Sequence, residues 1–252
     1  MPLSPTHGHS MNPVAVFRHA PTEGPGYLAT FLDRHRIAWR LVKLDEGEPV
    51  PANAAGFAGL AFMGGPMSVN DPLPWVDPAL SLIRDAASRR VPVIGHCLGG
   101  QLLSKALGGV VRPNPVKEIG WHRVEVEDTP LARDWFGADL RSFTTFQWHG
   151  ETFTIPPGGS RILRGEHCPN QAYVVGGLHL GMQCHVEMTP ELLRSWCETG
   201  ADEIALARHG PAVQDTLAIG REARERLPML SETAQRLYSR WVRGLAGETG
   251  TA

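Results

Sequence analysis

The fold of this chain is decided by the stretch Val93-Ile94-Gly95-His96-Cys97-Leu98-Gly99-Gly100-Gln101. It begins as an apolar run typical of a buried strand, and a helical pattern then continues from Leu98 to Leu107. The turn between them reads Gly95-x-Cys97-x-Gly99, in which the positions two residues either side of the cysteine must be small. Such a turn predicts a strand that leads directly into a helix, with Cys97 held at the bend.

Short apolar runs alternate with helical patterns through the first half of the chain. The predicted strands cover residues 14–17, 39–44, 60–63 and 91–94, and the predicted helices cover residues 27–36, 77–90 and 98–107. This alternation predicts an α/β fold with a mostly parallel central sheet covered by helices on both faces. Shorter β-like runs follow between residues 109 and 183, including a hairpin around Gly176-Gly177.

We expect one domain with a helical C-terminal extension. Residues 1–12 are polar and proline-bearing and predict a flexible tail, residues 13–200 the main domain, and residues 201–252 an extension packed on that domain. The helical pattern after Pro190 runs to near Gly244. Within it, we expect breaks at Gly210-Pro211 and at Leu227-Pro228.

The composition argues against several classes of function. The 24 basic and 26 acidic residues leave no large field that would attract nucleic acid or an anionic membrane. No apolar run approaches the length of a membrane span. The spacing typical of a disulfide framework or a zinc site is missing from the four cysteines, Cys97, Cys168, Cys184 and Cys197. We therefore expect a soluble, cytoplasmic protein without a metal or another cofactor.

The position of Cys97 favours a reactive thiol. At the N-terminus of the predicted helix, unpaired backbone N–H groups and the helix dipole favour thiolate over thiol. The N–H of Leu98 would face the same centre and stabilise an oxyanion. Free cysteines are usually small buried residues. Here, however, the strand before the turn, the helix after it and a downstream partner motif favour a nucleophile.

A cysteine nucleophile needs a histidine base and an acid that orients the histidine. Two His-x-Glu pairs are available, His149-Gly150-Glu151 and His185-Val186-Glu187. Residues two apart on an extended chain point to the same side, so the spacing does not distinguish the pairs. The run from Leu178 to Met182 predicts a buried strand that ends near His185, at the sheet edge where α/β sites form. This context favours His185 as the base and puts His149 in a more loop-like wall of the site.

These motifs together resemble the class I glutamine amidotransferases of the triad type. The resemblance is greatest to the stand-alone branch that is similar to the glutaminase domain of GMP synthetases. The segments that carry it are Gly64-Gly65-Pro66, residues 95–101, Leu107-Gly108-Gly109, Glu118-Ile119-Gly120-Trp121, residues 148–151 and residues 183–187. The fold expected with it is a flavodoxin-like three-layer αβα sandwich.

The resemblance implies a catalytic triad of Cys97 as nucleophile, His185 as base and Glu187 as the acid that orients it. Members of the family usually carry an aromatic residue and then His-Pro-Glu at this acid. This chain differs, because Cys184 and Val186 flank His185.

The resemblance also implies roles around the triad. The backbone at Gly65 and Leu98 would form the oxyanion hole, and Gln101 would contact the bound glutamine. His149 would lie near the pocket and contribute to substrate binding without belonging to the triad.

Three functions fit these residues. The first is a glutaminase that cleaves the side-chain amide of glutamine through a γ-glutamyl thioester and passes ammonia to a synthetase on another chain. The sequence itself lacks a Walker-type phosphate loop and a Ser-Gly-Gly-x-Asp segment, so the synthetase would be a partner. The second is a free-standing hydrolase of γ-glutamyl peptides or amines. The third, a non-catalytic binding protein with this fold, is disfavoured by the intact triad.

Overall fold

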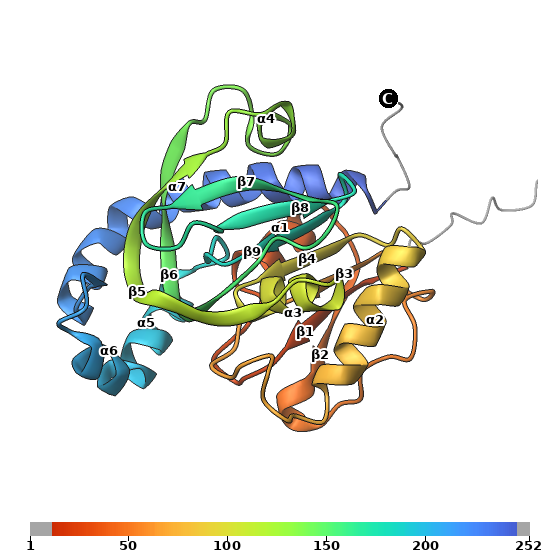
Figure 1. Ribbon diagram of the computed structural model, residues 1–252, viewed down its shortest axis with the longest axis horizontal. Helices are drawn as coiled ribbons and strands as arrows, with labels where there is room; N and C mark the ends of the chain where they lie inside the picture. Colours follow the sequence, from red (N-terminus) through yellow and green to blue (C-terminus); the bar gives the residue numbers. More distant parts are fainter. Residues whose placement is uncertain (1–11, 246–252) are drawn as a thin grey trace, which may run out of the picture.

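The computed structural model describes residues 12–245, which Figure 1 draws in colour. The strands are β1 (Val14–Arg18), β2 (Trp39–Lys43), β3 (Gly59–Phe62), β4 (Val93–His96), β5 (Val111–Val126), β6 (Ser142–Phe153), β7 (Gly159–Gly165), β8 (Ala172–Val175), β9 (His179–Met182) and β10 (Ala212–Val213). The helices are α1 (Tyr27–Arg34), the 3₁₀ turn η1 (Leu44–Glu46), α2 (Val76–Ser88), α3 (Leu98–Ala106), α4 (Pro130–Phe136), α5 (Pro190–Thr199), α6 (Ala201–Ala207) and α7 (Thr216–Arg243). Of the expected N-terminal tail only Asn12 is described, and residues 246–252 of the expected extension also lie outside the described part.

One ten-stranded sheet runs through the molecule in the order β10-β5-β7-β8-β9-β4-β3-β1-β2, with β6 paired to β5. The strands β2, β1, β3, β4 and β9 are parallel neighbours. The pairs β9–β8, β8–β7, β7–β5 and β5–β6 are antiparallel. The predicted α/β fold is therefore confirmed, and the predicted hairpin around Gly176-Gly177 consists of β8 and β9.

Helices cover both faces of the parallel strands (Figure 1). The side chains of β1 alternate between these faces, as the period of a strand requires. Ala15 and Phe17 belong to a core cluster with residues of α2 and α3. Val14 and Val16 belong to a second cluster with residues of α1 and α7. Because both faces are buried, β1 is an uninterrupted apolar run and not an alternating one.

The C-terminal part contains α6, the short strand β10 and the 28-residue helix α7. Helix α6 ends at Ala207, three residues before the break predicted at Gly210-Pro211, and β10 then pairs with β5. The break predicted at Leu227-Pro228 is wrong, because α7 continues through Pro228. Proline removes the hydrogen bond to the carbonyl of Arg224, but both residues are exposed and water can reach that carbonyl. The burial of Leu230 and Tyr238 holds the rest of the helix on the core.

Two findings bear on the expected environment of the protein. No helix within residues 12–245 is long and apolar enough to cross a membrane. All four cysteines are free thiols, and Cys97, Cys168 and Cys184 are buried.

The parallel half of the sheet brings four loops to one edge. The strands β1, β3, β4 and β9 run side by side in the same direction, so their carboxyl ends meet. The loop after β1, Gly64-Gly65 after β3, Cys97 after β4 and His185 shortly after β9 therefore come together at this edge. Open α/β sheets form their ligand sites in this position.

Candidate active site

Cys97 occupies the bend between β4 and α3 in a backbone conformation that is unusual for a residue with a side chain. Its φ of 49° makes it one of three non-glycine residues with positive φ within residues 12–245. Such conformations cost about 1–3 kcal/mol and persist only where the surroundings enforce them. The bend is held by the Cys97 N–H, which donates to the Met182 carbonyl of β9 at 2.8 Å. The thiol thus lies at the N-terminus of α3, next to the strand that leads to His185.

The flanking glycines are required by close packing of the bend. A Cβ at Gly95 would lie 2.3 Å from the backbone of Gly99, and a Cβ at Gly99 would lie 2.0 Å from the carbonyl oxygen of Phe62. Both distances are far below ordinary van der Waals contact. Glycine at these positions therefore lets α3 start directly over β3 and β4.

His185 is held at both its backbone and its ring. Its N–H donates to the Phe146 carbonyl of β6 at 2.9 Å, and its Nδ1 lies 2.7 Å from Oε1 of Glu187. Both side chains are buried, with His185 and Glu187 each 1% exposed. The Glu187 carboxylate keeps Nδ1 protonated, so Nε2 is the ring nitrogen that can gain or lose a proton. Among residues 12–245, Nε2 has no hydrogen-bond partner.

The electrostatics of this pair favour an imidazolium ion. Burial alone would lower the pKa of His185, but the negative charges of Glu187 and Cys97 outweigh it and hold the pKa well above its ordinary value. Burial would raise the pKa of Glu187, but His185 and His96 outweigh it and lower that pKa below its ordinary value. Each partner therefore stabilises the charged form of the other.

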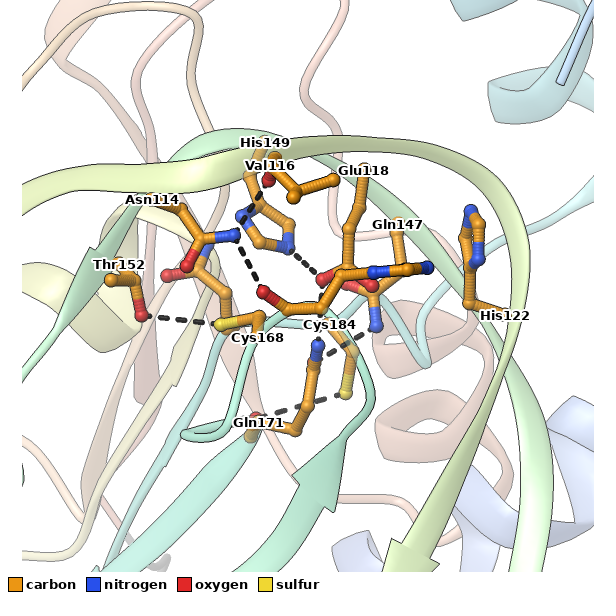
Figure 2. A network of polar contacts seen from close by, with 12 residues as sticks. Asn114, Val116, Glu118, His122, Gln147, His149, Thr152, Cys168, Gln171 and Cys184 are labelled. Carbon is orange, nitrogen blue, oxygen red and sulfur yellow. Dashed lines mark hydrogen bonds and ion pairs between the residues drawn. The ribbon is translucent and has the colours of Figure 1, made fainter. Parts of the chain in front are cut away.

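The second His-x-Glu pair does not form a corresponding contact. His149 lies in β6 and not in a loop, so that part of the prediction is wrong. Its Nδ1 is 2.9 Å from the backbone oxygen of Glu151, whose carboxylate instead accepts from Ser68 at 3.1 Å. Its Nε2 is 3.0 Å from Oε2 of Glu118, as Figure 2 shows. Both ring nitrogens of His149 are thus engaged by the protein.

Figure 2 also shows the polar network around Glu118, which joins side chains of β5 and β6 to side chains of the loop before β8. Gln171 donates to Glu118 at 3.0 Å, and the thiol of Cys168 lies 3.2 Å from the Thr152 hydroxyl. Glu118, His149 and Cys168 bring potential metal-ligand atoms within 4.8 Å of one another. Each of these three side chains is hydrogen-bonded to a protein group, whereas Asn114 Oδ1 and Gln147 Oε1 in the same network have no partner among the described residues.

The remaining predicted residues lie around Cys97. Leu98 is the first residue of α3, where a backbone N–H has no partner within the helix. Gly65 lines the cavity beside it, and a Cβ there would lie 2.7 Å from the Leu98 side chain. Gln101 is buried, and its Nε2 donates to Oε1 of Gln183 at 3.2 Å.

Sequence reasoning missed three residues at this site. Gln183 approaches the Cys97 sulfur with its Nε2 at 3.4 Å, and Trp196 packs edge-on against His185 with ring centroids 4.7 Å apart. Glu23, from the loop after β1, lines the same cavity. Gln183 belongs to the motif around His185, which was the one available signal. Glu23 and Trp196 join the site only through the fold.

A further missed contact reaches the site from the C-terminal helix. His96 precedes Cys97, and its Nε2 is hydrogen-bonded at 2.9 Å to the Tyr238 hydroxyl of α7. The same nitrogen lies 4.0 Å from Oε2 of Glu187. Through His96, α7 therefore contacts the back of the Glu187 carboxylate.

A cavity of about 660 Å³ opens over these groups. Its lining includes Cys97, Gln101, His149 and His185 from the main body. Glu203 of α6 also reaches it, paired with Lys117 and accepting from Trp148 Nε1 at 2.8 Å. A volume of this size suits a small organic ligand.

Comparisons with known proteins agree with this arrangement. The family model for class-I glutamine amidotransferases matches residues 32–197. A glutamine amido transferase structure from Methylobacillus flagellatus is 46% identical, with a TM-score of 0.91 over 93% of this chain and 96% of that one. The glutamine amidotransferase-like protein YfeJ of Salmonella typhimurium is 32% identical over 197 residues, which are 75% of this chain and 82% of that protein.

A more partial likeness links the chain to GMP synthases. A glutamine-hydrolysing GMP synthase chain from Saccharolobus solfataricus is 32% identical over 107 residues, 42% of this chain and 54% of that relative. The match therefore spans about half of that relative. The family model and the two longer matches decide the assignment: the chain belongs to the class-I glutamine amidotransferase family.

Proposed function

We propose that this protein hydrolyses the side-chain amide of glutamine or of a related γ-glutamyl compound through a thioester on Cys97. The observation that carries the proposal is a single arrangement: a thiol at a helix N-terminus shares a cavity with a buried histidine whose Nδ1 is 2.7 Å from a carboxylate. Cysteine hydrolases need these three groups in this relation.

The proposed reaction has two steps, formation of a thioester on Cys97 and its hydrolysis, and His185 transfers a proton in both. His185 Nε2 holds the proton of the Cys97 thiol, in line with the imidazolium form favoured there, and the thiolate sulfur adds to the γ-carbonyl carbon. The oxyanion receives hydrogen bonds from the N–H groups of Gly65 and Leu98. The C–N bond then breaks, and the departing nitrogen takes the proton from His185. Water, activated by the same imidazole, cleaves the thioester to free glutamate and the thiol.

Two residues have supporting roles in the proposal. Gln101 lines the cavity and is oriented by Gln183, so it is placed to contact the γ-glutamyl group. For His149 we propose an indirect role. Because its ring is bound to Glu118 and Glu151, it would shape the substrate wall at Gly150 without donating to the substrate.

The fate of the released nitrogen leaves two versions of this function. A synthetase partner that consumes ammonia is suggested by the likeness to a GMP synthase chain. A free-standing γ-glutamyl amine hydrolase is favoured by the cavity, because its volume exceeds what the glutamine side chain alone would fill. The free thiols fit a reducing, cytoplasmic compartment for either version.

The test is hydrolysis of glutamine and of γ-glutamyl amides, followed by release of ammonia or amine. We expect turnover by the unmodified protein and its loss in Cys97→Ala, because no other group can form the thioester. Cys197→Ala is the matched control, since it removes a thiol that lies outside the cavity, and it should keep full activity. Turnover by Cys97→Ala close to that of the unmodified protein would contradict the proposal.

A further inference from the structure

The loop after β1 brings a carboxylate to the side of His185. A Cβ built on Gly64 would lie 2.7 Å from Oε2 of Glu23 and 3.2 Å from Cε1 of His185. The Glu23 carboxylate and the Cε1 edge of His185 therefore both lie close to the α-carbon of Gly64, where a side chain would crowd them. Glu23 and His185 also line the same cavity as Cys97.

This loop is held firmly against the site. Trp196 Nε1 donates to the carbonyl of Thr22 at 2.9 Å, and the N–H of Tyr27 donates to the carbonyl of Glu187 at 2.8 Å. Gly26 has a φ of 51°, and a Cβ there would lie 2.2 Å from the same Glu187 oxygen. The backbone on both sides of Glu23 is thus tied to elements that carry the triad or pack against it.

The Glu23 carboxylate has no hydrogen-bond donor of its own among residues 12–245. The other carboxylates of the cavity do have partners: Glu203 is paired with Lys117, and Glu151 accepts from Ser68. Lys117 is the lysine that lines the cavity, and it is already used. Glu23 is therefore an acceptor that lines the cavity without a hydrogen-bond donor from the described protein, and the positive charge that acts on it there is that of His185.

The surroundings of Glu23 disfavour its ionised carboxylate when the cavity holds no ligand. Burial raises the pKa of Glu23 to about 7, with the charge of His185 lowering it and that of Glu187 raising it. A cation beside the carboxylate would remove this penalty, because an opposite charge favours the ionised form. A positively charged ligand group bound beside Glu23 would thus stabilise its ionised carboxylate.

The side of the cavity next to His185 is the side of the leaving group. In amide cleavage by Cys97, the sulfur–carbon bond forms, the carbon–nitrogen bond breaks, and the nitrogen takes the proton held on His185 Nε2. The leaving nitrogen must therefore lie within reach of His185 when it departs. Whatever substituent this nitrogen carries extends into the wall near Glu23.

We propose that Glu23 determines specificity for the leaving group, and that the preferred substrates are γ-glutamyl amides of amines that carry a second, positively charged ammonium group. The inference rests on the proposed function and specifies its substrate class. The carboxylate would bind the distal ammonium while Cys97 and His185 act on the amide. Glu23 takes no part in the proton transfers.

Two substrates of equal length separate charge from size: the γ-glutamyl amides of diaminobutane and of pentylamine, which differ in an ammonium against a methyl group. We expect the unmodified protein to prefer the diaminobutane amide on the order of tenfold in kcat/KM at low salt, as a charged hydrogen bond would give. In Glu23→Gln the ratio of the two kcat/KM values should fall to near one. Added salt should weaken the preference of the unmodified protein and leave that of the variant unchanged.

Two further variants serve as controls. Glu198→Gln removes an equal charge from the exposed side of α5 and should keep the original ratio. Glu23→Asp keeps the charge on a shorter side chain and should retain part of the preference, which distinguishes lost charge from a disturbed loop. An unchanged ratio in Glu23→Gln, or a preference of the unmodified protein for the pentylamine amide, would overturn the inference while leaving the proposed function standing. Absence of turnover on both amides and on glutamine would overturn the function itself.

Discussion

His185 and His149 differ in the partner that each ring meets. Both are buried histidines followed two residues later by glutamate, yet only His185 meets the carboxylate of that glutamate, at 2.7 Å. The ring of His149 meets the backbone of Glu151 and the side chain of Glu118. A free Nε2 in the cavity therefore exists at His185 and not at His149, and the base of the proposed reaction follows from that difference.

Single-turnover kinetics can rank the members of the proposed triad. His185→Ala should slow thioester formation on the order of 10⁵-fold, because no neighbouring group accepts the thiol proton. Glu187→Gln should be milder, on the order of 10³–10⁴-fold, because the imidazole remains but loses the partner that fixes its tautomer and stabilises its cation. Quenched-flow measurement of amine release gives both rates.

His149→Ala serves as the contrasting variant in the same experiment. It removes one hydrogen-bond partner of the buried Glu118 carboxylate and leaves it with that of Gln171, so we expect it to lower the free energy of unfolding by about 2 kcal/mol. Its chemical step should be much less affected than that of His185→Ala. A greater loss of the chemical step in His149→Ala would show that the base has been misassigned.

The cysteine turn and the two His-x-Glu pairs could be identified from the sequence because each is a local pattern. Glu23 could not, because nothing within a few residues of it relates to catalysis. Its position beside His185 results from the parallel pairing of β1, β3, β4 and β9. The same holds for Trp196, whose ring reaches His185 from α5.

Among the elements, α7 has the least expected connection to the site. It packs on α1 and α4 and reaches the bend between β4 and α3 through Tyr238, whose hydroxyl is hydrogen-bonded to His96 immediately before Cys97. The helix thereby supports the strand end that carries the thiol and the second oxygen of Glu187. A C-terminal element remote in sequence thus helps to position the proposed triad.

Removal of one hydroxyl tests this connection. Tyr238→Phe should lower the free energy of unfolding by about 1 kcal/mol, the contribution of a buried hydrogen bond. It should also slow the chemical step about fivefold, because His96 loses its fixed orientation behind Glu187. Tyr27→Phe is the matched control: its hydroxyl makes an exposed 3.4 Å contact with Gln235 of the same helix and should change neither quantity. Equal effects of the two substitutions would contradict a positioning role for Tyr238.

Element types were easier to predict than element ends. The apolar run at residues 14–17 correctly predicted a strand, because a strand buried on both faces is apolar throughout. The pattern after Cys97 correctly predicted a helix, because Gly95 and Gly99 mark the bend from which it starts. Pro228 misled because its cost in a helix depends on whether the freed carbonyl can be hydrated. His149 was placed in a loop-like wall because the strand that contains it is stabilised by pairing with β5, a partner distant in sequence.

The sheet has a parallel half, whose strand ends carry residues of the candidate site, and a mostly antiparallel half, which forms one wall of the cavity. The first could be predicted from the alternation of strands and helices. The order of the second, with β5 next to β7 and β10 at the edge, could not, since many pairings of short strands satisfy the same pattern. The ends of the parallel strands nevertheless suffice to bring Cys97 and His185 together.

The stability of the molecule should decrease in acid because of buried neutral histidines. Burial, with a smaller effect of Arg90, lowers the pKa of His179 from 6.5 to about 4. The unfolded chain therefore binds a proton at a pH where the folded chain does not, and stability is lost as the pH falls from about 6.5 to about 4. His179→Gln should flatten this part of the curve by on the order of 2 kcal/mol. Denaturant unfolding across that range measures it, with the exposed His209→Gln as a control that leaves the slope unchanged.

In the proposed reaction, Cys97 carries the γ-glutamyl group as a thioester. The most direct measurement is acid quenching of the protein during turnover of a γ-glutamyl amide, followed by peptide mapping by mass spectrometry. We expect a γ-glutamyl adduct on the peptide that contains Cys97, appearing with the first release of amine and absent from Cys97→Ala. Accumulation of the adduct should be unaffected by Cys197→Ala. Amide hydrolysis without any adduct on Cys97, or with the adduct on another cysteine, would show that Cys97 is not the nucleophile.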